Sequence, residues 1–222
     1  NTITRPLIKI SCTDVNKSVF NKIYKTVLDH NEGYALDFYE MTDGTREFEI
    51  LAYEYIAGKP LYSALVEQDL DSTTIVHIIL ILLCTLIGVG FVTDGKFCHS
   101  DLHTSNVLIS NNNTVFRYIY HVEDITFNIK MKCKVKPIII DFGLATIKDS
   151  NNTSRTAYTG DFIDILIYIE LGLLHKDSKN KHISLFINEV RESYDKELHE
   201  WLSHTIFTDY VHTTKRDRGD KV

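Results

Sequence analysis

FCHSDLHTSNVLI, residues Phe97–Ile109, is the stretch of this sequence that is most informative about its fold, together with a later stretch, Ile138–Ala145, IIIDFGLA. Each stretch places an acidic or amide side chain at the end of an apolar, strand-like run. Asp101 and Asn106 come from the first stretch, and Asp141 comes from the second. Because rigid strands would hold the loops that carry them, we expect these three side chains to lie together at one site.

Two carboxylates and an amide in this order suit phosphoryl transfer. That reaction needs one carboxylate to orient the attacking hydroxyl, and an amide and a second carboxylate to hold magnesium against the phosphates of ATP. We predict the first role for Asp101 and the metal-binding role for Asn106 and Asp141. The alternative is that both stretches are ordinary polar turns after buried strands.

Both stretches resemble motifs of the protein-kinase-like superfamily, whose catalytic loop is His-Arg-Asp-x-x-x-x-Asn and whose metal-binding element is Asp-Phe-Gly. His99, Asp101 and Asn106 match the first motif in identity and spacing, and Asp141–Gly143 match the second. The resemblance is to divergent members, haspin-like or viral-type, and it implies a serine/threonine kinase that uses ATP and Mg2+. It also implies an α+β, two-lobed fold with a reduced N-terminal sheet lobe and a mainly helical C-terminal lobe.

The catalytic loop departs from the family pattern at two positions. Ser100 replaces the arginine that contacts a phosphorylated activation loop in many kinases, so we do not expect switching by that route. His103 replaces the lysine that neutralises the transferring phosphate in most serine/threonine kinases. An imidazole can still donate a hydrogen bond to the phosphate or to Asp101, which makes His103 a candidate catalytic residue. The alternative is a packed histidine that orients the loop.

The length of 222 residues fits one large domain or two small lobes. We expect a small N-terminal lobe over residues 1–55, in which the strand Arg5–Ser11 precedes a helix, Asp14–Leu28. Lys9 resembles the strand lysine that grips the nucleotide phosphates in kinases, so it is a candidate for catalysis and cofactor binding. The helix after it carries no glutamate and no glycine-rich loop precedes it, so a missing segment or a partner would complete this lobe.

A second pair of strands, Tyr34–Met41 and Glu47–Ile56, is predicted as a hairpin from the Asp-Gly between them. The segment that follows resembles the hinge between kinase lobes. The resemblance implies that the backbone of Glu54 and Ile56 bonds the adenine edge, and that Leu108 forms the floor under the adenine. The alternative is a simple strand exit.

The larger lobe is expected over residues 56–222 and begins with a strongly apolar run, Ile75–Val92. The run is long enough to raise the question of a membrane span. Because His77, Thr85 and two glycines interrupt it and the catalytic loop follows directly, we predict a buried core helix and no membrane span.

Residues 111–137 lie between the two motifs and form a longer segment than most kinases have there. Thr114–Tyr120 and Thr126–Val135 alternate like two strands, so we expect an inserted hairpin packed on the lobe surface. The segment from Leu144 to Gly160 is short and contains no Ala-Pro-Glu, so we do not expect the usual peptide-docking platform.

Three helices are expected in the remaining chain: Asp161–Leu174, Ile183–Val190 and Asp195–Phe207, the last with Trp201 and Leu202 in the core. The resemblance implies that Asp161 holds the backbone of the catalytic loop, with Asp164 as the second choice. A helix N-cap is a compatible role for Asp161.

The net charge of −6 argues against a nucleic-acid partner, because phosphate contacts call for a basic surface. Four scattered cysteines without C-x-x-C spacing indicate reduced thiols and a cytoplasmic location, or the nucleus or the host cytoplasm for a viral protein. The expected partner is a protein substrate with a serine or threonine acceptor.

Two other functions stay open. A small-molecule kinase of the aminoglycoside or choline type is favoured by Asp101-Leu102-His103 and by the missing Ala-Pro-Glu, whereas the intact Asp141–Ala145 favours a protein kinase. A pseudokinase that acts as a binding module is favoured by the absent glycine loop and helix glutamate.

Overall fold

The computed structural model describes residues 6–12, 48–53, 56–67, 70–147, 157–175, 180–193 and 195–215. The chain divides into two compact units, one over Thr4–Tyr55 and another that contains Ile56–Val222. Each unit is described by itself below. The chain is mixed α and β, as an α+β fold requires.

The described part of the smaller unit is an antiparallel pair of strands, β1 (Pro6–Cys12) and β2 (Phe48–Tyr53). Both strands were predicted and are confirmed. Lys9 lies opposite Leu51, and the register is irregular between Pro6 and Ile8, where proline supplies no N–H to the ladder. The predicted helix Asp14–Leu28 and the first strand of the predicted hairpin, Tyr34–Met41, lie outside the described residues.

The larger unit is built around α4 (Ser72–Thr93), which confirms the helix predicted from the apolar run. Asp71 begins the helix by accepting a hydrogen bond from the Thr74 N–H at 2.7 Å. Asp94 ends it in the left-handed conformation and donates its N–H to the carbonyl of Gly90. Within the described part of the chain, α4 is the one helix long and apolar enough to cross a membrane, and most of that apolar stretch is buried inside the unit.

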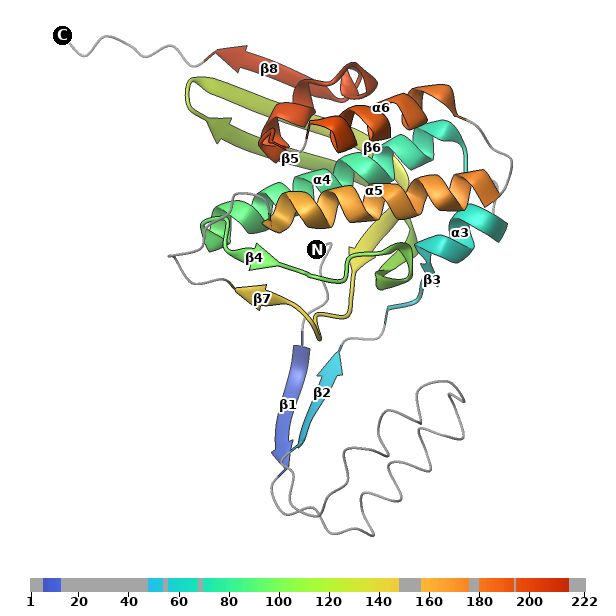
Figure 1. The fold of residues 1–222 in the computed structure, drawn as a ribbon, viewed down its shortest axis with the longest axis vertical. Helices are drawn as coiled ribbons and strands as arrows, with labels where there is room; N and C mark the ends of the chain where they lie inside the picture. The colour runs from blue at the N-terminus through green and yellow to red at the C-terminus, as the bar shows by residue number, and fades with distance from the viewer. Residues whose placement is uncertain are drawn as a thin grey trace, which may run out of the picture. The chain divides into compact units, whose positions relative to one another are not determined.

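A four-stranded antiparallel sheet covers one side of α4 (Figure 1), with the strand order β3-β5-β6-β8. Its strands are β3 (Lys59–Pro60), β5 (Val107–Val122), β6 (Ile125–Ile139) and β8 (Val211–Lys215). β5 and β6 form one long hairpin that contains the region expected as an insertion. The predicted hairpin forms, and one of its faces belongs to the core, because alternate β6 side chains are buried against α4: Phe127, Ile129, Met131, Cys133 and Val135.

Two further long helices complete this unit. α5 (Ala157–His175) packs against α4, and α6 (Lys181–Glu192) packs against α5. Asn180 begins α6 by accepting hydrogen bonds from two backbone N–H groups, and four apolar α6 side chains are buried. A short helix, α3 (Leu61–Glu67), packs against α5. Both long helices predicted after Gly160 therefore form, α5 four residues earlier than expected.

The last predicted helix, Asp195–Phe207, was wrong in type. The structure has two short 3-10 helices, Leu198–Ser203 and Thr205–Phe207. His204 separates them, because its backbone is extended and its Nδ1 accepts a hydrogen bond from the Ile206 N–H at 3.2 Å. Trp201 and Leu202 are buried, as predicted.

Candidate active site

The loop predicted to be catalytic runs from β4 (Phe97–Cys98) through a 3-10 turn, Thr104–Asn106, into β5. Asp161 of α5 holds its start, because the carboxylate accepts hydrogen bonds from the N–H of His99 at 2.6 Å and of Ser100 at 3.0 Å. Ser100 has a φ of 65°, a conformation that a residue with a Cβ adopts at a cost and that these bonds stabilise. The predicted role of Asp161 is confirmed.

The second role predicted for Asp161, a helix N-cap, was wrong, because α5 begins at Ala157 and Asp161 lies inside it. Asp161 is 2% exposed. Burial raises the pKa of its carboxyl, and the two backbone N–H groups lower that pKa only in part. Asp164, the second choice, is exposed on the same helix and takes no part in holding the loop in the described structure.

Asn106 closes the loop onto Asp101. Its Nδ2 donates to the Asp101 carbonyl at 2.9 Å and to the Asp101 carboxylate at 3.2 Å, and its own N–H donates to the His103 carbonyl at 2.9 Å. Asn106 is buried, whereas the Asp101 side chain is 42% exposed. The loop thus fixes a carboxylate while leaving it open to a reactant.

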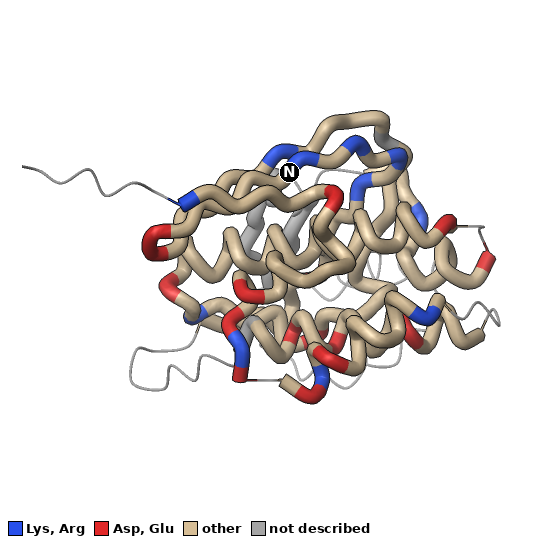
Figure 2. Tube along the Cα trace, turned by 90° about the horizontal axis from the view of Figure 1, so that it is seen from above, with Lys and Arg blue, Asp and Glu red and all other residues tan. Residues whose placement is uncertain are grey.

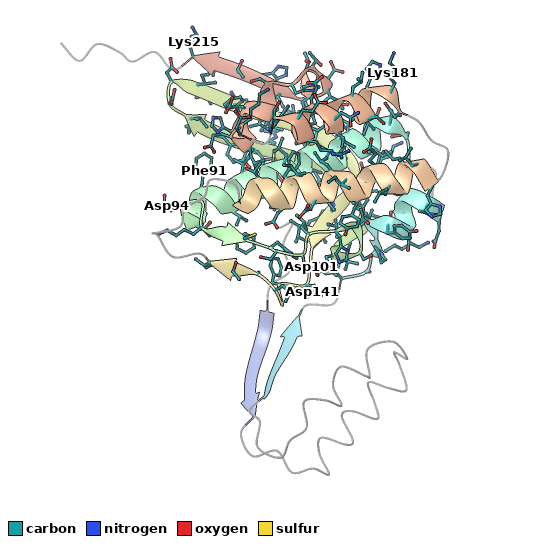
Figure 3. The ribbon with its side chains drawn as sticks, viewed as in Figure 1. Phe91, Asp94, Asp101, Asp141, Lys181 and Lys215 are labelled. Atoms are coloured by element: carbon teal, nitrogen blue, oxygen red, sulfur yellow. The ribbon has the colours of Figure 1, made fainter. Side chains whose placement is uncertain are left out.

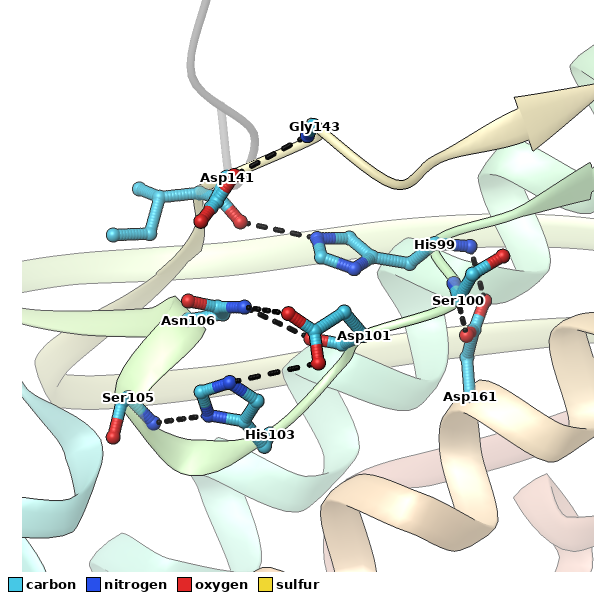
Figure 4. Close-up of polar contacts among 10 residues, drawn as sticks. His99, Ser100, Asp101, His103, Ser105, Asn106, Asp141, Gly143 and Asp161 are labelled. Carbon is cyan, nitrogen blue, oxygen red and sulfur yellow. Dashed lines mark hydrogen bonds and ion pairs between the residues drawn. The ribbon is translucent and has the colours of Figure 1, made fainter. Parts of the chain in front are cut away.

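His103 faces the same carboxylate (Figure 4). Its Nδ1 accepts from the Ser105 N–H at 3.2 Å, which leaves the proton on Nε2, and Nε2 lies 3.7 Å from Asp101 Oδ1. The ring also packs against Tyr168 of α5, with a distance of 5.6 Å between the ring centroids. His103 therefore lies where it can orient the Asp101 carboxylate.

The pairing at the open end of the β5–β6 hairpin brings Asp141 close to Asn106. Val107 pairs with Ile139, and the Ile140 N–H donates to the Asn106 carbonyl at 2.9 Å. Asp141 follows directly, with a φ of 58°, and its Oδ1 accepts from the Gly143 N–H at 3.2 Å. Figures 3 and 4 show Asp101 and Asp141 at the same edge of the larger unit.

His99 and Phe142 form the packing beneath this edge. His99 is 1% exposed, its Nε2 lies 3.0 Å from the Ile140 carbonyl oxygen, and its ring centroid is 5.0 Å from that of Phe142. Phe142 also contacts Phe97 of β4. A short strand, β7 (Thr146–Ile147), pairs with β4 and returns the chain beside the loop.

The donor atoms at this edge fit a hard divalent cation. Asn106 Oδ1 and Asp141 Oδ2 accept no hydrogen bond from any described residue, and oxygen ligands of this kind suit Mg2+, which keeps water and phosphate as its other ligands. No group of three His, Cys, Asp or Glu side chains converges as a metal site in the described ranges. A site of one amide and one carboxylate would not form such a group.

The segment expected as the hinge is described from Ile56, which is half-buried, whereas Glu54 lies outside the described residues. Pro60 of β3 pairs with Leu108, which is half-buried. A Cβ on Gly58 would lie 2.9 Å from the Ile109 carbonyl oxygen, so only glycine allows this close approach. The structure therefore brings the end of the hinge segment and Leu108 together.

Lys9 lies on β1 in the smaller unit, and its side chain is outside the described residues. Sequence reasoning missed Tyr168 and the Ile140 carbonyl. Tyr168 had a signal, since it follows Asp161 by seven residues and lies on the same side of the helix. The contact of His99 with the Ile140 carbonyl could not be predicted from the sequence, because any residue at position 140 supplies a backbone carbonyl.

A scan against protein-family models finds no match to this chain, and a search of curated proteins finds no match either.

Proposed function

We propose that this protein is an ATP- and magnesium-dependent phosphotransferase, and specifically a divergent serine/threonine protein kinase with a two-lobed, protein-kinase-like fold. The observation that carries the proposal is the double role of Asn106. Its side-chain amide donates hydrogen bonds to the carbonyl and the carboxylate of Asp101. Its backbone carbonyl accepts a hydrogen bond from the N–H of Ile140, the residue before Asp141. One residue thus ties the candidate base to the candidate metal ligand.

Each residue has a specific role in this proposal. Asp101 orients the acceptor hydroxyl and takes its proton, and His103 steers Asp101 through its Nε2–H. Asn106 and Asp141 hold Mg2+, which when bound neutralises charge on the phosphates of ATP. The close contact of β3 with Leu108 supports the adenine-binding role of that residue and of Ile56.

The remaining family features stay predictions. These are nucleotide contacts from Lys9 and from the Glu54 backbone, the assignment of the two units as kinase lobes, and a cytoplasmic location. The pairing of β1 with β2 supports the first of them in part, because it places the Lys9 strand directly beside the strand that leads to the hinge segment.

The direct test is transfer of label from [γ-32P]ATP in the presence of Mg2+ to casein and to a histone mixture, followed by phosphoamino-acid analysis. We expect label on serine or threonine with the wild-type protein. Asp101→Asn should lower the rate by about 1000-fold, because it removes the base. Asp195→Asn, an exposed carboxylate away from the loop, is the matched control and should transfer normally.

Two outcomes would overturn the proposal. Transfer to kanamycin or choline but not to protein would assign the small-molecule class instead. ATP binding without transfer to any acceptor would indicate a pseudokinase.

A further inference from the structure

The outer face of the β5–β6 hairpin carries a row of lysines. Side chains of β6 alternate between the core and solvent, and the positions that face outward include Lys130, Lys132, Lys134 and Lys136. The first three are exposed and the fourth is half-buried. Since alternate residues of a strand are spaced by about 6.8 Å, the row is roughly 20 Å long.

Repulsion between neighbouring positive charges destabilises this row of lysines when no partner is bound. Arg117 of β5 lies directly opposite Lys130, and like charges in directly opposed positions destabilise a sheet. Among the described residues only Lys134 of this set has an ion pair, with Asp71 at 3.7 Å. Figure 2 shows Lys and Arg positions gathered along one edge, although the whole chain has a net charge of −6.

We propose that this face, defined by Arg117, Lys130, Lys132 and Lys136, docks a short, extended, acidic segment of another protein. Carboxylates at every second position of an extended segment would match the lysine spacing. Val115 and Ile119 lie on the same face and are 43% and 63% exposed, so they offer apolar contacts between the charges. An ion pair with the segment would relieve the repulsion between Arg117 and Lys130.

A nucleic acid fits this face less well than an acidic polypeptide. Single strands bind through aromatic side chains on which the bases stack, but Phe116, Tyr118 and Tyr120 pair with buried β6 residues and face the core side. Glu123 and Asp124 form the turn at one end of the hairpin, and Asp71 lies beside Lys134. A long polyanion would also meet Glu123 and Asp124, whereas a segment as short as the row would meet Asp71 alone.

This inference does not depend on the proposed phosphoryl transfer. Binding is measured without ATP, and Asp101→Asn should bind the segment as the wild type does. Loss of transfer and loss of docking are therefore separate results.

The test uses fluorescence anisotropy with a labelled eight-residue peptide of alternating glutamate and valine, at low ionic strength. Competitors are a shuffled peptide of the same composition and an eight-nucleotide oligothymidylate. The test variant is Lys130→Gln/Lys132→Gln/Lys136→Gln. The control removes three lysines elsewhere, Lys96→Gln/Lys181→Gln/Lys196→Gln, and thermal melting verifies that both variants fold.

We expect the alternating peptide to bind more tightly than the shuffled one. The hairpin variant should weaken binding by about tenfold and the control variant by less than about twofold. A second variant, Val115→Ser/Ile119→Ser, should weaken binding without changing its salt dependence. Equal losses in the two lysine variants, tighter binding of oligothymidylate, or no binding of the peptide would each overturn the proposal.

Discussion

The candidate catalytic loop, His99–Asn106, and the candidate metal-binding turn, Asp141–Ile147, lie at the same end of one hairpin but are held by different contacts. The loop is fixed by long-range contacts, above all by the buried Asp161 of α5. The turn is mostly exposed and is held by the bond from the Gly143 N–H to Asp141, by the packing of Phe142 on His99, and by the short β4–β7 pair. The hairpin register therefore sets where the two carboxylates lie, and different contacts set how each one points.

Asp141→Asn tests the exposed turn and should lower the rate nearly as much as Asp101→Asn does. Asparagine tolerates a positive φ, so we expect the fold to be kept while a charged metal ligand is lost. The rate of transfer should fall about 100-fold to 1000-fold, with a higher Mg2+ requirement, because several kcal/mol of charge stabilisation depend on the metal. A Mg2+ titration of activity measures this, and an unchanged requirement would show that Asp141 is not a ligand.

Asp161→Ala tests the buried anchor of the loop. The change leaves the N–H groups of His99 and Ser100 without their acceptor, at a cost of about 2–4 kcal/mol in the free energy of unfolding. Urea denaturation measures the loss. Asp164→Ala, an exposed carboxylate on the same helix, is the control and should change stability by less than about 0.5 kcal/mol. Equal losses in the two variants would contradict the anchoring role.

His103→Asn tests the positioning of Asp101 within the loop. Asparagine can still accept the Ser105 N–H, but it does not reach the Asp101 carboxylate. We expect kcat to fall by about tenfold with little change in the KM for ATP, since the effect acts on the base alone. The pH profile of kcat should shift as well. A loss in KM with an unchanged kcat would instead assign His103 to nucleotide binding.

The pH dependence of stability should show the smallest effect. Burial raises the pKa of Asp161 in the folded protein above its ordinary value of 3.8. The contribution of this group to stability is therefore full below pH 3.8 and is lost as the pH rises through the raised pKa. The difference in melting temperature between the wild type and Asp161→Asn should shrink over that window, and a widening difference would show that the backbone hydrogen bonds outweigh burial.

Local pattern was sufficient to predict much of the fold. The apolar run gave α4, and period-two alternation gave β1 and the two arms of the hairpin. The alternation of β6 shows that one face is apolar, but it does not show which element covers that face, and in the structure this element is α4. The break at His204 was missed because a side-chain cap, rather than a proline or glycine, interrupts the helix.

The site was predictable where it depends on spacing along the chain. The five-residue interval between Asp101 and Asn106 allows the amide to bond the carboxylate, and the order of the two motifs suggested that Asp141 lies nearby. Contacts that depend on three-dimensional packing were not visible, namely those of His99 with the Ile140 carbonyl and of His103 with Tyr168.

A crystal structure of the protein with Mn2+ and a non-hydrolysable ATP analogue would show where the metal ion binds, because the anomalous signal of Mn2+ locates it. We expect an ion that is bonded to both Asn106 Oδ1 and the Asp141 carboxylate at about 2.1 Å, with the Asp101 carboxylate facing the γ-phosphate. An ion bound elsewhere, or bonded to neither residue, would contradict this expectation.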